Sequence, residues 1–253
     1  MPNRKLHRIA MATAILTGIL LAITGTQRVD AASGLPATVR DQMDAASKSF
    51  TSAQADVRQE LFTKVVHDTE TQTGQIYFLR KAGSIEMGMK LLPAGATPGA
   101  QPAQVMEFKD GKARMFNPGT NQVDEASAAG KNASIAETFL TLGFGGSATD
   151  IAKAWTIDDQ GTEQLNDGKQ AVKTEKLDLV PKDPSIRNTF SHVIIWIDPT
   201  RDVSLKQVFY EASGGVPSGD TRTVFYTNIV LNQKIDPTAF AIKCKGKCNV
   251  VTH

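Results

Sequence analysis

The chain has 253 residues, of which 21% are charged and 6% aromatic, and its formal net charge is +2. Its basic residues form no run with interleaved aromatic side chains of the kind typical of single-strand binders, so nucleic acid is not an expected partner. Beyond the N-terminus no apolar stretch approaches the ~20 residues that span a bilayer, so the mature chain is expected to be soluble.

The N-terminus has the order of residues typical of a secretory signal peptide. Basic residues up to Arg8 precede an apolar run from Ile9 to Ile23, and small residues follow up to Ala32. We expect residues 1–31 to be the signal, with cleavage after Ala31 or Ala32, and the mature protein to be periplasmic. A retained anchor is the alternative, although the run of about 15 residues is too short to span a bilayer. Four basic residues and Asp30 leave with the signal, so the formal charge falls from +2 to −1.

The mature segment, residues 32–253, is expected to be one domain. Val39, Met43 and Ala46 recur at helical spacing after Pro36, which predicts an amphipathic helix over residues 36–47. The period then changes to two, which predicts antiparallel strands. The expected strands cover residues 53–61, 74–81, 85–92, 105–109, 112–117, 122–125, 155–158, 162–165, 168–179, 191–197, 204–211 and 221–231.

The connections are of two kinds. Asp110-Gly111 and the residues from Asn117 to Asn121 have the turn chemistry of tight hairpins, so strands adjacent in sequence are expected to pair. Residues 93–103 are rich in Pro, Gly and Ala and are expected to form a mobile loop. Residues 134–154 break the strand pattern, and Ser134 can cap a helix that presents Ile135 and Phe139. We expect two short helices there, the second over residues 149–154.

Few residues have a pattern that suggests catalysis. Within the mature segment His67 and His192 are the histidines that could act as bases, and neither belongs to a recognisable motif. No nucleophile elbow, zinc-binding His-Glu-x-x-His, P-loop or dinucleotide fingerprint is present. We therefore expect no enzyme activity, no metal and no cofactor.

A set of apolar side chains shares one face of the expected sheet. By the two-residue alternation these are Ile76, Phe78, Met87, Met89, Met106 and Phe108. Flexible thioether side chains adapt to ligands of variable shape, so we predict a cavity for acyl chains, to which Met43, Ile135 and Phe139 are expected to contribute. The alternative is that these residues form an ordinary core under the helices.

Arg80 lies on the same face as Ile76 and Phe78, and its permanent charge must find acceptors or reach water. One interpretation is that the side chain extends to solvent at the sheet edge. The other is that it binds carbonyl groups of the covering helices, or a lipid headgroup, and controls opening.

The two cysteines, Cys244 and Cys248, lie close together near the C-terminus. In an exported protein a disulfide is the default expectation, and its role would be to hold the C-terminal segment in place. A metal pair is the alternative, with His253 as the remaining candidate ligand.

Several segments, in this order, resemble the LolA-like family of outer-membrane lipoprotein carriers, whose fold is similar to those of LolB, RseB and the mycobacterial LppX and LprG proteins. These segments are Phe50–Val57, Gly74–Lys81, Asp110–Pro118, Ile197–Thr200, Val208–Tyr210, Phe225–Ile229 and Asn232–Phe240. The chain departs from the family at Lys81, where a proline is usual, and in its cysteine pair.

This resemblance implies a mainly β fold of the α+β class, an incomplete antiparallel barrel or half-barrel with helices covering its concave face. It also implies that Arg80 is the lid latch. The expected function is a monomeric periplasmic carrier of lipoproteins or lipid acyl chains, which takes cargo from an inner-membrane donor complex and passes it to an outer-membrane acceptor. A sensor of mislocalised lipoproteins, of the RseB kind, is the alternative.

Overall fold

The computed structural model describes residues 34–81, 84–97, 99–127 and 142–252. The expected signal peptide lies outside the described residues, as do residues 134–141 of the first expected lid helix, with Ile135 and Phe139. Residues 31–253 form one compact unit.

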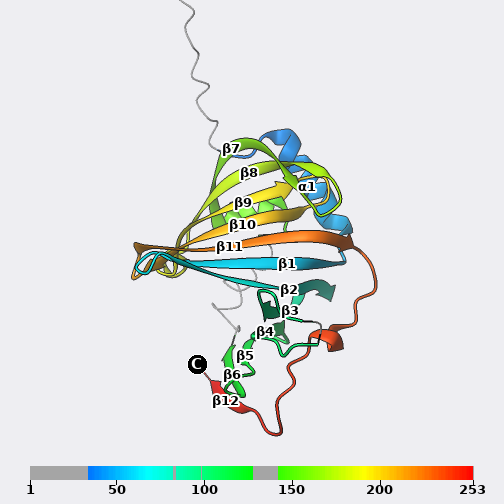
Figure 1. The fold of residues 1–253 in the computed structure, drawn as a ribbon. Helices are drawn as coiled ribbons and strands as arrows, with labels where there is room; N and C mark the ends of the chain where they lie inside the picture. The colour runs from blue at the N-terminus through cyan, green and yellow to red at the C-terminus, as the bar shows by residue number, and fades with distance from the viewer. Residues whose placement is uncertain (1–33, 82–83, 98, 128–141, 253) are drawn as a thin grey trace, which may run out of the picture. The chain divides into compact units, whose positions relative to one another are not determined.

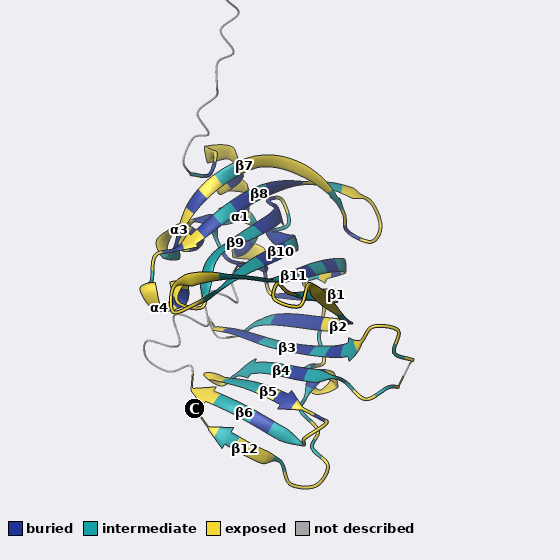
Figure 2. Ribbon diagram, turned by 60° about the vertical axis from the view of Figure 1, so that its left-hand side comes forward, coloured by how far each residue is buried: buried dark blue, intermediate teal, exposed yellow. Residues whose placement is uncertain are grey.

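In the described part of the chain, twelve strands form one sheet in the order β12-β6-β5-β4-β3-β2-β1-β11-β10-β9-β8-β7 (Figure 1). The strands are β1 (Ser52–Thr63), β2 (Asp68–Lys81), β3 (Ser84–Pro93), β4 (Gln104–Lys109), β5 (Lys112–Asn117), β6 (Gln122–Ser127), β7 (Trp155–Asn166), β8 (Ala171–Pro181), β9 (Phe190–Asp198), β10 (Val203–Ser213), β11 (Val216–Leu231) and β12 (Asn249–Thr252). β7 and β12 stand at opposite ends of this order, so the sheet is open (Figure 2). The predicted mainly β half-barrel is confirmed.

The hairpins follow the turn chemistry of the sequence. Asp110 and Gly111, between β4 and β5, have φ of 53° and 69°, and Asn121 before β6 has φ of 54°. Asn and Asp tolerate this left-handed region better than other residues with a side chain, and Gly enters it freely. The pairing of β1 with β11 joins segments more than 150 residues apart, as in Val57 with Tyr226, and local sequence does not predict it.

Each strand has two faces, which we call inner and outer. The inner face carries Ile76 and Phe78 of β2 and Met89 of β3, and the outer face carries Tyr77. Two large apolar clusters lie on the inner face: one is centred on β1, β2, β3 and β11, and the other on β8 and β9. The dark segments of Figure 2 follow these strands.

The helices belong to the second cluster. α1 (Ala37–Ser49) buries Val39 and Met43, and α3 (Ala148–Ala154) buries Ile151 against the same strands. The Asp44 carboxylate of α1 accepts hydrogen bonds from the Thr149 amide (3.1 Å) and hydroxyl (2.8 Å), which joins the two helices. α1 covers the predicted range and α3 the second predicted lid helix. The short helices α4 (Pro184–Arg187) and η1 (Pro237–Phe240) were not predicted.

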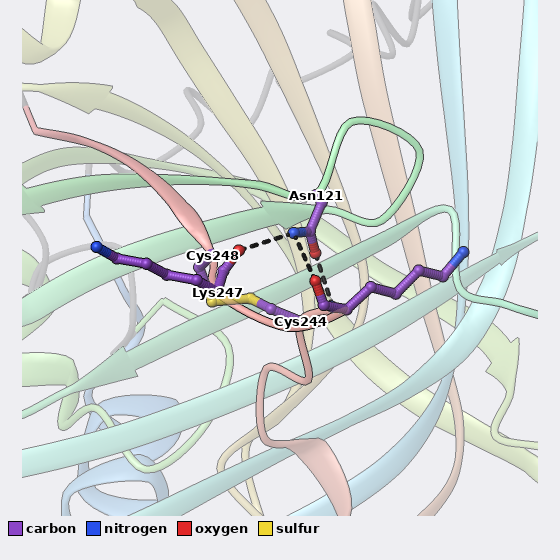
Figure 3. The surroundings of a disulfide bond; sticks show 5 residues. Asn121, Cys244, Lys247 and Cys248 are labelled. Atoms are coloured by element: carbon purple, nitrogen blue, oxygen red, sulfur yellow. Dashed lines mark hydrogen bonds between the residues drawn. A yellow bond between two sulfur atoms is a disulfide. The ribbon is translucent and has the colours of Figure 1, made fainter.

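The C-terminal segment crosses the outer face. Phe240 packs on Tyr77 with 4.8 Å between ring centroids, and β12 pairs in parallel with β6. Between them Cys244 and Cys248 form the predicted disulfide, which packs against the outer-face residues Val105, Phe116 and Val123. Asn121 binds this loop through its side chain: it accepts from the Lys245 amide (2.8 Å) and donates to the Lys247 carbonyl (3.0 Å) (Figure 3). The disulfide is therefore part of a docked segment.

Residues 94–97 and 99–103 connect β3 and β4 without regular structure, and Ala103 donates to the Leu91 carbonyl at 2.8 Å. The mobility expected of this loop stays a prediction. Within the described residues no helix has both the length and the apolar character required to cross a bilayer.

Candidate functional site

A cavity of about 480 Å³ opens on the inner face. Alternate side chains of β2, β3 and β4 form one wall, since strand residues two apart point the same way. These are Ile76, Phe78, Met87, Met89, Met106 and Phe108. The structure thus brings together six of the nine residues predicted for an acyl-chain cavity. The volume of this cavity lies within the ~300–1,000 Å³ that is typical of small-molecule sites.

Met43 does not line this cavity. It is fully buried in the second cluster, with Leu142, Ile151 and Trp155. The helical period correctly places Met43 on the inward side of α1, but α1 lies against the β8 and β9 part of the sheet. Met43 therefore attaches the helix to the sheet.

The opposite wall comes from residues that the sequence interpretation did not select. Phe190 and Phe209 approach with 5.5 Å between ring centroids, and Val224 and Tyr226 extend the wall along β11. Val224 and Tyr226 alternate on one strand, so the pattern that identified the first wall could have found them. Tyr226 donates a hydrogen bond to Gln207 at 3.0 Å, and burial raises the pKa of its hydroxyl above the ordinary value, so it stays neutral.

Arg222 of β11 lines this cavity and lies 3.3 Å from Glu211. The Arg114–Glu107 pair, at 3.3 Å, is on the outer face, since Glu107 lies opposite Gly88, the neighbour of Tyr77. Pairing lowers the cost of charges beside an apolar wall. A larger cavity of about 970 Å³ borders Asp56, Arg58 and Lys90 and the η1 segment, and it contains none of the predicted cavity residues.

Phe144 packs against one residue of each cavity wall. Its ring stacks on Phe78 at 4.4 Å and meets Tyr226 edge-on at 5.1 Å, and it is 1% exposed. We call residues 142–147 the Phe144 segment. Backbone bonds hold it to β10: Ser204 donates to the Gly143 carbonyl at 2.7 Å, and Phe144 forms a bridge with Val203. Sequence periodicity does not identify Phe144, because it stands alone among glycines.

Arg80 joins α1 to the Phe144 segment. Its guanidinium donates to the Ser47 carbonyl at 2.8 Å and to the Gly145 carbonyl at 2.5 Å, and it lies 5.5 Å from the centre of the Phe50 ring. These bonds lie beside a polar cavity of about 560 Å³. Arg80 thus contacts helix and segment carbonyls, one of the two arrangements considered for it. Its control of opening stays a prediction.

The two candidate bases lie elsewhere. His67 is in the β1–β2 turn with its ring centroid 6.4 Å from that of Phe62, and His192 packs on Tyr210 at 4.1 Å. Within the described ranges, no group of three His, Cys, Asp or Glu residues is arranged to hold a metal ion.

Comparison with known proteins gives similarity in fold. No family model matches the chain, and no curated protein matches it in sequence. Among solved structures, an uncharacterized conserved protein from Thermus thermophilus is 13% identical, with a TM-score of 0.48 over 85% of this chain and 98% of that one. A putative outer membrane lipoprotein-sorting protein domain from Vibrio parahaemolyticus is 12% identical (TM-score 0.42; 80% and 94% covered). A LolA superfamily protein from Nitrosomonas europaea is 14% identical (TM-score 0.37; 81% and 96% covered).

Members of the LolA superfamily are thus among the solved structures that this chain is similar to. At these identities the likeness concerns the fold.

Proposed function

We propose that this protein is an exported, non-enzymatic carrier that holds the acyl chains of lipoproteins or lipids in the inner-face cavity. The observation that carries the proposal is the wall of Ile76, Phe78, Met87, Met89, Met106 and Phe108 around a 480 Å³ space. Hydrocarbon is the ligand that such a wall accepts at the lowest cost in desolvation.

Binding and release follow from the size of the apolar contact. Each methylene that leaves water contributes about 0.8 kcal/mol, so a fully enclosed chain would dissociate very slowly. A carrier needs a cavity that opens. The Phe144 segment and the C-terminal end of α1 are the parts that open, and Arg80 holds both in the closed arrangement.

The proposal includes a route. Cargo is received in the periplasm from an inner-membrane donor and is passed to an outer-membrane acceptor that binds it more tightly. No covalent step is required, because transfer depends on the difference between two affinities.

Native mass spectrometry of the mature protein, with and without added diacyl lipopeptide, tests the proposal. We expect a bound species of lipid mass. Met106→Asp, which places a carboxylate in the cavity wall, should lower retention at least tenfold. Val250→Asp changes an exposed residue of the edge strand β12, far along the sheet order from β2 and β3. It is the matched control and should bind lipopeptide as the parent does.

Protein that is empty when isolated and takes up no lipopeptide would contradict the carrier function. Equal retention by Met106→Asp and the parent would show that the acyl chains bind elsewhere.

A further inference from the structure

Asp202 is a buried acid that lies just before β10. The residue is 1% exposed, and neither carboxylate oxygen has a hydrogen-bond partner among the described residues. Its backbone is fixed, since φ is 54° and its amide donates to the Asp198 carbonyl at 2.9 Å. An ionised carboxylate in such a place is unfavourable, and the group takes up a proton instead. Burial raises the pKa of Asp202 to about 8.

Gly145 connects Asp202 to the Arg80 contacts. The Gly145 amide donates to the Asp202 carbonyl at 3.1 Å, and the Gly145 carbonyl accepts from Arg80 at 2.5 Å. Gly145 has φ of 73° and a Cβ there would overlap the Phe50 ring, so this residue must be glycine. The segment that Arg80 holds is therefore also the segment seated on Asp202.

The charged groups around Asp202 come from several elements. Arg80 of β2 lowers the pKa of Asp202, and Asp44 of α1 raises it. In its own turn, Arg201 is paired with Asp198 at 2.6 Å and with Asp167 at 3.1 Å. On α3, Asp150 is paired with Lys153 at 2.8 Å. Within the described residues Arg80 forms no ion pair, and its guanidinium is bound by carbonyl groups.

We propose that Asp202 is a positioning residue of the Arg80 latch and that its proton couples the latch to pH. While the Phe144 segment is seated, Asp202 is neutral and Arg80 stays on the Ser47 and Gly145 carbonyls. When the segment lifts, water reaches Asp202, its proton passes to solvent, and the carboxylate attracts Arg80 away from those carbonyls. Between the pKa of the open state and that of the closed state, each opening releases one proton. The inference rests on the proposed function, because it assigns regulation to the same cavity.

The direction of the pH effect on opening follows from the linkage between proton binding and conformation. The closed state binds the proton more tightly, so low pH favours it. The opening equilibrium should rise up to tenfold per pH unit, from the pKa of the open state to that of the closed state, and should level off above it.

Hydrogen exchange of the Gly145 amide, measured by NMR in the ligand-free protein from pH 5 to 9 and corrected for intrinsic exchange, reports this opening. We expect the corrected opening constant of the parent to rise with pH and level off near pH 8, and that of Asp202→Asn to be flat. Asn keeps the size and tolerates the positive φ. Asp41→Asn, at an exposed acid of α1, is the control and should follow the parent.

An opening constant that changes with pH to the same extent in the parent and in Asp202→Asn would overturn the inference. If Asp202→Asn does not fold, a carbon-13 titration of the Asp202 carboxyl in the parent decides, and a midpoint near 4 would overturn it. Lipopeptide uptake is measured in parallel. If Gly145 exchange depends on pH as expected but no lipopeptide is taken up, the Asp202 assignment is retained and the carrier function is rejected. If lipopeptide is taken up but Gly145 exchange does not change with pH, the Asp202 assignment alone is rejected.

Discussion

The Phe144 ring stacks on the Phe78 ring at 4.4 Å, with 21° between the ring planes. Phe78 belongs to the cavity wall, while Phe144 belongs to a segment held by hydrogen bonds to β10 and to Arg80. The contact therefore joins the apolar cavity to the part of the protein that we expect to move. Removing the ring of Phe78 or of Phe144 should therefore change both lipid binding and the stability of the fold.

Phe144→Ala should enlarge the cavity and lower the free energy of unfolding by about 3–5 kcal/mol, the usual range for a buried phenylalanine. We expect tighter binding of longer acyl chains, because the space left by the ring becomes available to them. Denaturant unfolding and displacement of a fluorescent fatty acid measure the two effects. Phe116→Ala, buried on the outer face, is the control: it should destabilise the protein and leave binding unchanged.

Arg80→Leu should leave the fold intact and accelerate exchange of bound lipid at least tenfold. The change removes two charge-assisted hydrogen bonds, each of which contributes about 1.5–3 kcal/mol to the closed arrangement. Arg80→Lys should lie between the parent and Arg80→Leu, since an ammonium lacks the fork that reaches two carbonyls. Stopped-flow transfer to acceptor vesicles gives the rates. Exchange as slow as in the parent would remove Arg80 from the mechanism.

Asp202→Asn should change the pH dependence of global stability. The folded-state pKa of Asp202 is about 8, and in the unfolded chain it returns to the ordinary value of 3.8, so its stabilising contribution is complete below that value. The contribution is lost as pH rises toward 8, on the order of 1.4 kcal/mol per pH unit. Asp202→Asn should therefore gain stability relative to the parent from pH 5 to 8. Thermal unfolding across this range, with Asp41→Asn as the control, measures the difference.

Replacing both Cys244 and Cys248 by serine should loosen the C-terminal segment and leave lipid binding unchanged. Cross-linking so short a loop restricts the unfolded chain little, so we expect a loss of about 2 kcal/mol or less. Limited proteolysis should cut the variant beyond Phe240, while the Asn121 contacts protect the parent. Loss of lipid binding in the variant would show that the outer-face segment also supports the cavity.

Much of the site could be predicted because strand alternation is a local property. Within each strand the two-residue period groups Ile76 with Phe78, Met87 with Met89 and Met106 with Phe108. The register of β2 with β3 and of β3 with β4 then puts the three pairs on one face. The hairpin turns at Asp110-Gly111 and the short disulfide loop are equally local. The sequence by itself therefore determined the antiparallel strands, the apolar alternation within each strand and the cysteine pairing, whereas the half-barrel was what the resemblance to the LolA-like family implied.

The tertiary structure decided the features that depend on long-range packing. Met43 has the right helical phase, but which part of the sheet its helix covers depends on contacts with distant strands. Phe144 meets the cavity residues Phe78 and Tyr226 only in the folded chain, where Arg80 donates a hydrogen bond to Gly145, 65 residues away in sequence. Asp202 has the sequence of an ordinary turn residue, and its exposure of 1% is a property of the folded chain. The sequence around a residue indicates the strand or helix period and the turn chemistry at that position. The burial of the residue and the charges around it depend on distant segments that meet only when the chain folds.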